Sequence, residues 1–294
     1  MSAPTRSGFI ALAGRPNVGK STLANAVVGA KVAIVSDKPQ TTRRAIRGVA
    51  SGPGWQLVLV DLPGVQRPRD ALTERMQRRV EHELEDADGC LFVINAEEGV
   101  GPGDRFIAGL LQAARVPVVI AVNKVDRTNR SGTASALQAA ADLDVAEEVF
   151  PVSAATGSGV GRLVDCLVSL LPEGPFYFEP EQRSDQSQPV MLAELVREQV
   201  LARTRQEVPH SVEVVVEGID HGEPIRIEAV ILAETESQKR ILIGAGGQMV
   251  KSIGIASRRA IERELGTRVH LDLKVRVRRH WRADERMLDR LGIE

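Results

Sequence analysis

The fold of this chain is decided by the stretch Gly14-Arg-Pro-Asn-Val-Gly-Lys-Ser-Thr22, which joins a short apolar run to the start of a helical pattern. It matches the phosphate-binding pattern G-x-x-x-x-G-K-[ST] in the strand-to-helix context that this pattern requires. Glycines let consecutive backbone N–H groups face one anion, and the helix adds its positive N-terminal end. Lys20 would bridge the β and γ phosphates, and the Ser21 hydroxyl would hold Mg²⁺. The nucleotide contacts expected here are Gly14, Asn17, Val18, Gly19, Lys20, Ser21 and Thr22.

Short β-rich runs alternate with longer helical patterns between residues 8 and 171. Several of the runs are apolar almost throughout, which is typical of a sheet covered by helices on both faces. The alternation predicts an α/β fold with a doubly wound, mostly parallel sheet that binds its ligand at the carboxyl ends of the strands. The expected strands are 8–13, 45–50, 56–61, 89–95, 116–123 and 148–153, and the expected helices are 20–28, 71–86, 103–114, 133–143 and 159–171.

The identity of the base is indicated by Asn123-Lys-Val-Asp126, which follows an apolar strand. The Asp126 carboxylate would accept hydrogen bonds from the ring N–H and the exocyclic amine of guanine. Adenine presents an acceptor at the ring position and would leave a buried charge unpaired. Asn123 would meet the base edge, and the stem of Lys124 would lie along the ring. The next strand ends at Ser153-Ala154, where a backbone N–H could reach the guanine carbonyl oxygen.

Two further motifs would respond to the γ-phosphate. Asp61-Leu-Pro-Gly64 ends a strand, so that Asp61 would hold Mg²⁺ through water and the Gly64 N–H would contact the phosphate. In Gln40-Thr-Thr-Arg43 a threonine hydroxyl would complete the Mg²⁺ shell when GTP orders this connection and the loop after Gly64. We favour Thr42 over Thr41. The motifs together predict binding and hydrolysis of GTP, with Lys20, Thr42, Asn17 and Gly64 as catalytic groups.

The residue after Gly64 is Val65, where the familiar small GTPases carry a glutamine that orients the attacking water. A valine side chain cannot form hydrogen bonds, so we expect intrinsic hydrolysis to be slow or to use another group. The amide oxygen of Asn17 could hold a monovalent cation where an arginine finger would otherwise lie. We therefore hypothesise stimulation by potassium. The alternative is that Asn17 only caps the loop.

Length and composition bound the class of protein. The 294 residues suffice for two ordinary domains, and 43% hydrophobic with 26% charged residues is typical of a globular chain. No apolar run approaches the roughly 18 residues that span a bilayer, and residues 1–7 lack the pattern of a secretory signal. Cys90 and Cys166 are too few for a disulfide framework and are expected to be reduced. These features predict a cytoplasmic protein.

The alternating pattern ends at residues 172–189, which hold four of the 15 prolines. We interpret this segment as a linker, with a first domain at 1–172, the linker at 173–190 and a second domain at 191–294. The Phe176-Tyr-Phe178 cluster is expected to pack against a domain surface rather than to stack on bases. In the second domain we expect a helix at 191–204, strands at 211–219, 225–232 and 239–243, a helix at 248–265, a strand at 269–277 and a short tail at 280–294.

Charge is distributed unevenly in the second domain, although the net charge of -1 excludes a general polycation. Residues 239–294 hold 14 basic and 7 acidic side chains, as expected for a phosphate-backbone partner. Gly244-Ala-Gly-Gly247 is a G-x-x-G turn, which lets a backbone approach a nucleic-acid strand closely. Ala245 and Gly246 add no charge to this turn. Single-stranded RNA is the predicted ligand, with contacts from Gly244, Ala245, Gly246, Gly247, Lys251, Arg258, Arg259, Lys274 and Arg276.

The GTPase motifs, followed by one domain with the element order of a type II KH domain, resemble the Era family of bacterial GTPases over essentially the whole chain. The resemblance implies a factor that assists assembly of the 30S ribosomal subunit. It implies binding near the 3′ end of 16S rRNA, with GTP gating binding and release. It also implies peripheral association with the inner face of the cell membrane, which no residue supports. The alternative is a signalling GTPase whose C-terminal domain binds protein.

Overall fold

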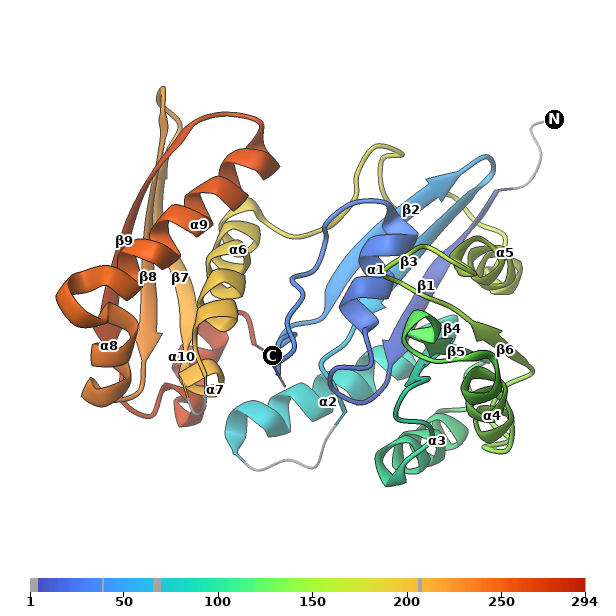
Figure 1. Ribbon diagram of the computed structural model, residues 1–294. Helices are drawn as coiled ribbons and strands as arrows, with labels where there is room; N and C mark the ends of the chain where they lie inside the picture. Colours follow the sequence, from blue (N-terminus) through green and yellow to red (C-terminus); the bar gives the residue numbers. More distant parts are fainter. Residues whose placement is uncertain (1–4, 39, 66–69, 206–207, 294) are drawn as a thin grey trace.

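The computed structural model describes residues 5–38, 40–65, 70–205 and 208–293. Two domains lie side by side in Figure 1, the first on the right and the second on the left. The connection between the first helix and the second strand, residues 29–45, runs between them. Thr41 and Thr42 therefore lie at the boundary between the domains.

The first domain is built on a six-stranded sheet with the order β2-β3-β1-β4-β5-β6. β2 is antiparallel to β3, and the other neighbours are parallel, so the carboxyl ends of the parallel strands meet at one edge. The predicted mostly parallel sheet is confirmed. The strands are β1 (Arg6–Ala13), β2 (Ile46–Gly52), β3 (Trp55–Asp61), β4 (Gly89–Asn95), β5 (Val118–Asn123) and β6 (Glu148–Pro151).

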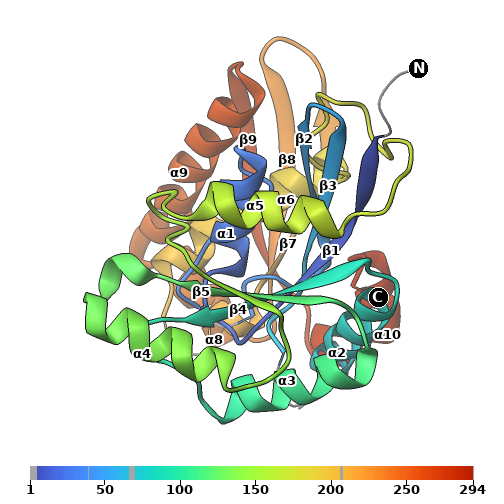
Figure 2. The same cartoon turned by 90° about the vertical axis from the view of Figure 1, so that its right-hand side faces the viewer.

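Helices cover both faces of this sheet, as Figure 2 shows. Ile10 and Leu12 of β1 belong to a core cluster with α1 and α5, whereas Ala11 and Ala13 belong to a cluster with α2, α3 and α4. Successive residues of one strand thus enter opposite cores, as the period of two requires. The helices are α1 (Lys20–Val28), α2 (Ala71–Glu85), α3 (Pro102–Ala114), α4 (Arg130–Ala141) and α5 (Val160–Leu170), with a short 3₁₀ turn η1 (Val125–Arg127).

The second domain contains a three-stranded sheet with the order β7-β8-β9, in which β7 is antiparallel and β9 parallel to β8. Three helices, α6, α8 and α9, pack on one face of the sheet. Among the described residues no helix has the length and apolar character needed to cross a membrane. The elements are α6 (Gln188–Arg203), α7 (Val208–Ser211), β7 (Glu213–Asp220), β8 (Ile225–Ala233), α8 (Glu236–Ile243), η2 (Ala245–Gly247), α9 (Gln248–Leu265) and β9 (Val269–Val277).

The strand predicted at 239–243 is wrong, because these residues form the second half of helix α8. The side chain of Thr235 accepts a hydrogen bond from the backbone N–H of Gln238, and the side chain of Gln238 accepts one from the backbone N–H of Thr235. This capping box fixes a helical first turn and overrides the β-like apolar run Ile241-Leu-Ile243. Ser211, predicted to begin a strand, instead ends the short helix α7.

The linker packs along the first domain. The backbone N–H groups of Tyr177 and Phe178 donate to Oε1 of Gln56 at 2.9 Å, and the rings of Tyr177 and Phe9 are 4.8 Å apart. The expected packing of the aromatic cluster is confirmed. Further along, the N–H of Val49 in β2 donates to the carbonyl of Arg183 at 2.9 Å, and a bridge joins the neighbouring residues 48 and 184. The linker thereby covers the β2 edge of the sheet.

The tail, residues 280–293, contributes to the domain boundary. It forms η3 (Trp281–Ala283) and α10 (Glu285–Arg290). Trp281 and Leu288 share an apolar cluster with Leu72 and Met76 of α2, and Val215 of β7 packs against this cluster. The tail therefore fills the space between the open face of the second sheet and α2 of the first domain (Figure 1).

Candidate nucleotide site and RNA-binding groove

The loop between β1 and α1 wraps around the side chain of Lys20. Its Nζ donates to the carbonyls of Gly14 at 2.9 Å and Arg15 at 3.1 Å. Burial lowers the pKa of Lys20 to about 8, an effect that the carboxylate of Asp61 partly offsets. The loop and part of the 29–45 connection line one cavity, with Asn17, Gly19, Lys20, Ser21, Thr22, Thr42 and Gly64 among its walls.

Two glycines of this loop have no room for a side chain. Gly14 has φ 151°, and a Cβ on it would lie 2.6 Å from the carbonyl oxygen of Val93. Gly19 has φ 100°, and a Cβ there would clash with Nδ2 of Asn123. Positive φ and close approach together require glycine at both positions. The backbone N–H groups can thus converge as an anion-binding loop.

Ser21, Thr42 and Asp61 come together beside the phosphate loop. The Ser21 hydroxyl donates to Oδ2 of Asp61 at 2.6 Å, and Oγ1 of Thr42 lies 3.2 Å from the same oxygen and 3.1 Å from the Ser21 hydroxyl. The other carboxylate oxygen, Oδ1, is buried and has no hydrogen-bond partner among the described residues. Burial raises the pKa of Asp61, and Lys20 opposes this rise. Such an oxygen cluster with an unsatisfied carboxylate oxygen fits a hard cation such as Mg²⁺.

The geometry favours Thr42 over its neighbour. Thr41 turns its hydroxyl to the carbonyl of Lys38 at 2.6 Å, away from this cluster. Among the described residues no group of three or more His, Cys, Asp and Glu could hold a metal. An Mg²⁺ ion here would accordingly take most of its ligands from hydroxyls, water and phosphate, as is usual for nucleotide-bound magnesium.

The predicted base-binding residues lie after β5 and β6. The Asp126 carboxylate accepts from the hydroxyl of Ser153 at 2.6 Å, which fixes its orientation. Nζ of Lys124 donates to the carbonyl of Asn17 at 2.6 Å, so its stem crosses from the base-binding segment to the phosphate loop. The two motifs, 107 residues apart in the chain at this bond, form one site.

Asn123 links two parts of the site through its side-chain amide. Its Nδ2 donates to the carbonyl of Val18 at 3.0 Å, and its Oδ1 accepts from the N–H of Ala154 at 3.0 Å. One backbone N–H of the Ser153-Ala154 segment, that of Ala154, is therefore bonded to Asn123. This buried amide joins the phosphate loop to the turn after β6, and the contacts of Asn123 and of this segment with guanine stay predictions.

The remaining nucleotide-site residues bound the γ-phosphate side. Asn17 has φ 64°, and its Nδ2 donates to the carbonyl of Asp37 at 2.8 Å, which leaves the amide oxygen out of this contact. Gly64 packs against Pro16 so closely that a Cβ would lie 2.9 Å from the proline ring. Val65 is buried in the core. Of the loop after Gly64, residues 66–69 lie outside the described residues.

The second domain has a groove beside its glycine turn. Gly244 directly follows α8 and Gly247 directly precedes α9, so the turn lies between two helices rather than between a strand and a helix as expected. Ala245 and Gly246 at its tip are exposed. Lys251 and Arg258 of α9 line a groove whose other wall is β9, where the lining residues are His270, Leu271 and Leu273. Basic side chains therefore border an apolar floor next to the turn.

Three of the predicted RNA contacts lie elsewhere. Arg259 lines a neighbouring groove with Arg203 on the other flank of α9. Lys274 and Arg276 lie on the sheet face opposite to the helices, because their partners in β8 alternate with the core residues. They form ion pairs with Asp272 at 2.8 Å and Glu217 at 2.5 Å. The structure thus separates these two from the groove and neutralises their charges locally.

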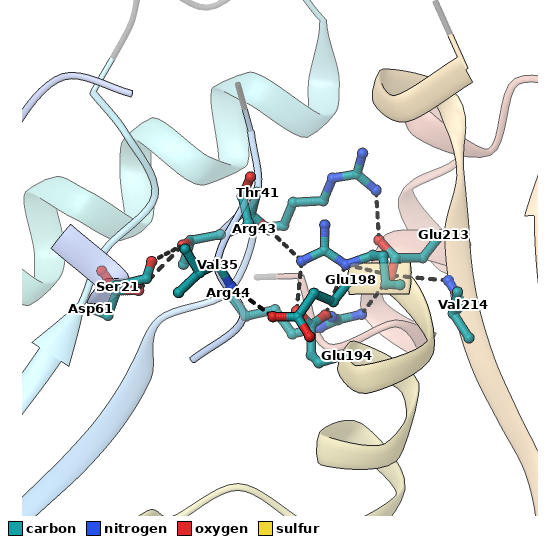
Figure 3. A network of polar contacts seen from close by, with 12 residues as sticks. Ser21, Val35, Thr41, Arg43, Arg44, Asp61, Glu194, Glu198, Glu213 and Val214 are labelled. Carbon is teal, nitrogen blue, oxygen red and sulfur yellow. Dashed lines mark hydrogen bonds and ion pairs between the residues drawn. The ribbon is translucent and has the colours of Figure 1, made fainter. Parts of the chain in front are cut away.

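Sequence reasoning missed a buried charge network between the domains, drawn in Figure 3. Arg43 donates from Nη1 to Oε2 of Glu213 at 2.8 Å, and Arg44 donates to Glu194 at 2.9 Å. Burial alone would raise the pKa of Glu213, but Arg44, Arg43 and Arg197 outweigh it and hold this pKa at about 2. The partners are 170 and 150 residues apart in the chain, so no local pattern reveals them.

A phosphate loop, a Ser–Thr–Asp oxygen cluster and a guanine-type carboxylate, followed by a G-x-x-G groove, define a P-loop GTPase with a C-terminal KH domain. Family models agree with this class. Residues 9–124 match the family described as "50S ribosome-binding GTPase", and residues 207–282 match the family described as "KH domain". The chain belongs to the Era family of GTPases, since relatives of that name are 42% identical over 98% of its length.

Similar proteins cover the chain from end to end. GTPase Era of Mycobacterium avium (strain 104) is 42% identical over 98% of each chain, and that of Mycobacterium tuberculosis (strain H37Rv) is 43% identical over 97% of this chain and 98% of its own. A structure of Era in complex with MgGDPNP and nucleotides 1506–1542 of 16S ribosomal RNA has a TM-score of 0.94 at 34% identity, and a GDP·AlF₄⁻ complex of an Aquifex aeolicus Era variant has 0.93 at 34%. Both cover 98% of this chain and 99% of theirs.

Proposed function

We propose that this Era-family GTPase binds Mg²⁺-GTP and hydrolyses it, and that the bound nucleotide controls whether its KH domain holds the single-stranded 3′ region of 16S rRNA during assembly of the 30S subunit. The observation that carries the proposal is the convergence of Ser21, Thr42 and Asp61 beside the phosphate loop, in a chain that also has a groove with basic side chains along the helix that follows a G-x-x-G turn. The solved Era complex with MgGDPNP and 16S rRNA supports the pairing of these two ligands.

On the nucleotide side, Lys20 and the backbone N–H groups of the loop would neutralise the phosphates, and Gly64 would contact the γ-phosphate. Ser21 and Thr42 would hold Mg²⁺ directly and Asp61 through water. When bound, the ion would offset the charge that develops on the transferred phosphoryl group. Asp126 would select guanine. Val65 has no group to orient water, so the hypothesis of potassium at the amide oxygen of Asn17 is part of the proposal.

On the RNA side, the glycine turn would bring the backbone against the phosphates of about four nucleotides. Lys251 and Arg258 would flank the strand, and the apolar floor at Leu271 and Leu273 would receive unstacked bases. The exposed tip at Ala245 and Gly246 offers backbone only. Arg259 lies farther from this path and would add to the general electrostatic attraction of the RNA, whereas Lys274 and Arg276 are paired with Asp272 and Glu217 and would add little.

The test is filter binding of a single-stranded RNA with the 3′ sequence of 16S rRNA, to protein that is nucleotide-free, GDP-loaded or GDPNP-loaded. We expect affinity to differ between the loaded forms. Equal affinity in all three states would refute the switch. Absence of any RNA binding would favour the alternative, a signalling GTPase whose second domain binds protein. Binding to the 30S subunit and peripheral membrane association stay predictions, which sedimentation with subunits and cell fractionation would check.

A further inference from the structure

The second domain forms hydrogen bonds with the 29–45 connection on both sides of Thr42. Before it, Nη2 of Arg197 in α6 donates to the carbonyl of Thr41. After it, the side chain of Arg43 enters the second domain and donates to the carbonyl of Val212 at 2.6 Å and to Glu213 at 2.8 Å. The hydroxyl of Thr42 points the other way, toward Asp61 at 3.2 Å. In Figure 3 the connection passes between the two sets of contacts.

These contacts are buried and mutually supported. Arg197 and Glu213 have no exposed surface, and Arg43 is 3% exposed. Glu194 holds Arg197 in place through two bonds, at 3.0 and 2.6 Å. Trp281 covers Arg43, with the guanidinium carbon 5.4 Å from the ring centre. Groups packed to this degree have few alternative positions, so the backbone on either side of Thr42 is fixed by the second domain.

We propose that Arg197 and Glu213, two residues of the second domain, are positioning residues for the GTPase reaction. They hold the backbone at residues 41 and 43, and the Thr42 hydroxyl is thereby aimed at the Ser21–Asp61 pair. The inference rests on the proposed function, in which this hydroxyl completes the Mg²⁺ shell of GTP but not of GDP. It follows that the second domain helps to assemble the catalytic site of the first.

The effect follows from the short chain distance between the anchored residues and the Thr42 hydroxyl. Thr42 directly adjoins both anchored residues, so a shift of about an ångström at either anchor moves the hydroxyl by a similar amount. A misplacement of that size can lower a rate by about 100-fold. Because coupling between two ligands is reciprocal, anything that pulls the KH domain away from residues 41–43 also weakens binding of GTP relative to GDP.

The experiment uses the full chain and compares Arg197→Met with a matched control, Glu198→Gln. Glu198 is the next residue of α6 and also holds the same connection, through Lys31 at 2.6 Å and the N–H of Val35 at 3.1 Å. These contacts are made to residues 31 and 35, at least seven positions before Thr42. Three quantities are measured for each variant: kcat for GTP, the Mg²⁺ concentration that half-saturates GDPNP binding, and affinity for GDP.

We expect Arg197→Met to lower kcat about 10- to 100-fold and to raise the half-saturating Mg²⁺ concentration for GDPNP, with GDP affinity within about twofold of the original. Glu198→Gln should leave all three nearly unchanged. The inference is overturned if Arg197→Met behaves like Glu198→Gln, or if GDP and GDPNP affinities fall together.

A second variant allows the test if Arg197→Met does not fold. Arg197→Lys keeps a cation beside Glu194 but reaches with a single donor group, so it should give a smaller change in the same direction. If Arg197→Met cannot be purified folded, a raised Mg²⁺ requirement in Arg197→Lys supports the inference and an unchanged one overturns it. Failure of the original protein to hydrolyse GTP at all would instead refute the proposed function.

Discussion

Two glycine-rich turns in this molecule each lead into a helix, yet they differ in how closely other protein atoms approach their glycines. In the phosphate loop, Cβ atoms at Gly14 and Gly19 would meet Val93 and Asn123, which are parts of the protein itself. In the G-x-x-G turn only Gly244 is crowded in this way, by Met249. Gly246 and Gly247 have φ 57° and 78°, and an added Cβ on either would meet no atom of the described residues within 4 Å.

The difference separates two ways of recognising a phosphate. The phosphate loop is packed against other parts of the protein, so we expect it to enclose one ligand, with Lys20 at its phosphates and Asp126 of a separate segment selecting the base. The RNA turn is open on the outside and presents backbone, so it accepts a strand that continues past it in both directions. Specificity on the first side should therefore depend on single side chains, and on the second side on many weak contacts.

The largest effect is expected from Asp126→Asn, which tests whether one carboxylate decides the base. Loss of the acceptor for guanine should reduce GTP affinity about 1000-fold or more, and xanthosine triphosphate should become the better ligand. Competition binding with both nucleotides measures the exchange. Retained GTP affinity would show that Asp126 is not the base-reading group.

The next largest effect contrasts Gly19→Ala with Gly247→Ala. At Gly19 the added methyl group meets Asn123 in a strained conformation, which should cost about 2–5 kcal/mol and abolish tight nucleotide binding. At Gly247 only the strain of φ 78° applies, about 1–2 kcal/mol of unfolding free energy, and nucleotide affinity should not change. Denaturant unfolding and nucleotide titration of both variants test this. Equal nucleotide affinities would mean that the crowding at Gly19 relaxes without consequence.

A smaller effect separates two lysines of the second domain. Lys251 lines the groove, whereas Lys274 is paired with Asp272 on the opposite face of the sheet. Lys251→Ala should weaken RNA binding and reduce the slope of log affinity against log salt by about 0.7, the value for one phosphate contact to a single strand. Lys274→Ala should leave that slope nearly unchanged. Filter binding across a salt series decides between them, and equal slopes for both variants would contradict the placement of the RNA.

The smallest expected effect concerns the monovalent cation. Hydrolysis in potassium buffer should exceed hydrolysis in sodium buffer severalfold, and Asn17→Ala should remove the difference. Turnover is measured at equal ionic strength, so that screening of exposed charges is the same in both buffers. Equal rates for the original protein would mean that Asn17 only holds the connection through Asp37.

Most of the first domain is predictable from sequence, because the patterns that identify its strands, helices and phosphate loop each lie within a short stretch of the chain. The strand–loop–helix context of Lys20 and the apolar strands are recognisable within short windows of sequence. The predicted helices and strands of both domains agree with the structure to within a few residues at their ends, apart from α8, and the short helices α7 and α10 are not predicted. That helix is not predicted although its capping box, Thr235 with Gln238, is visible in the sequence. The apolar run that follows the cap favours a strand when it is considered alone.

Other features cannot be inferred from one sequence. Whether a lysine faces a groove, as Lys251 does, or an acidic neighbour, as Lys274 does, depends on how α9 packs on the sheet and on the register of β9. The pairing of Arg43 with Glu213 depends on how two domains dock, and buried ion pairs of this kind leave no periodic pattern. The residue type of Asn123 suits contact with a base, but the structure uses both of its amide atoms to join three segments.

The contact between the linker and β2 has a consequence for the behaviour of the protein in concentrated solution. β2 is the outermost strand on its side of the sheet, and Arg183 and Ser184 lie along its free edge. Uncovered strand edges act as templates for another copy of the chain. Substitutions that detach this segment should leave the fold intact but promote self-association, so precipitation would precede any loss of turnover.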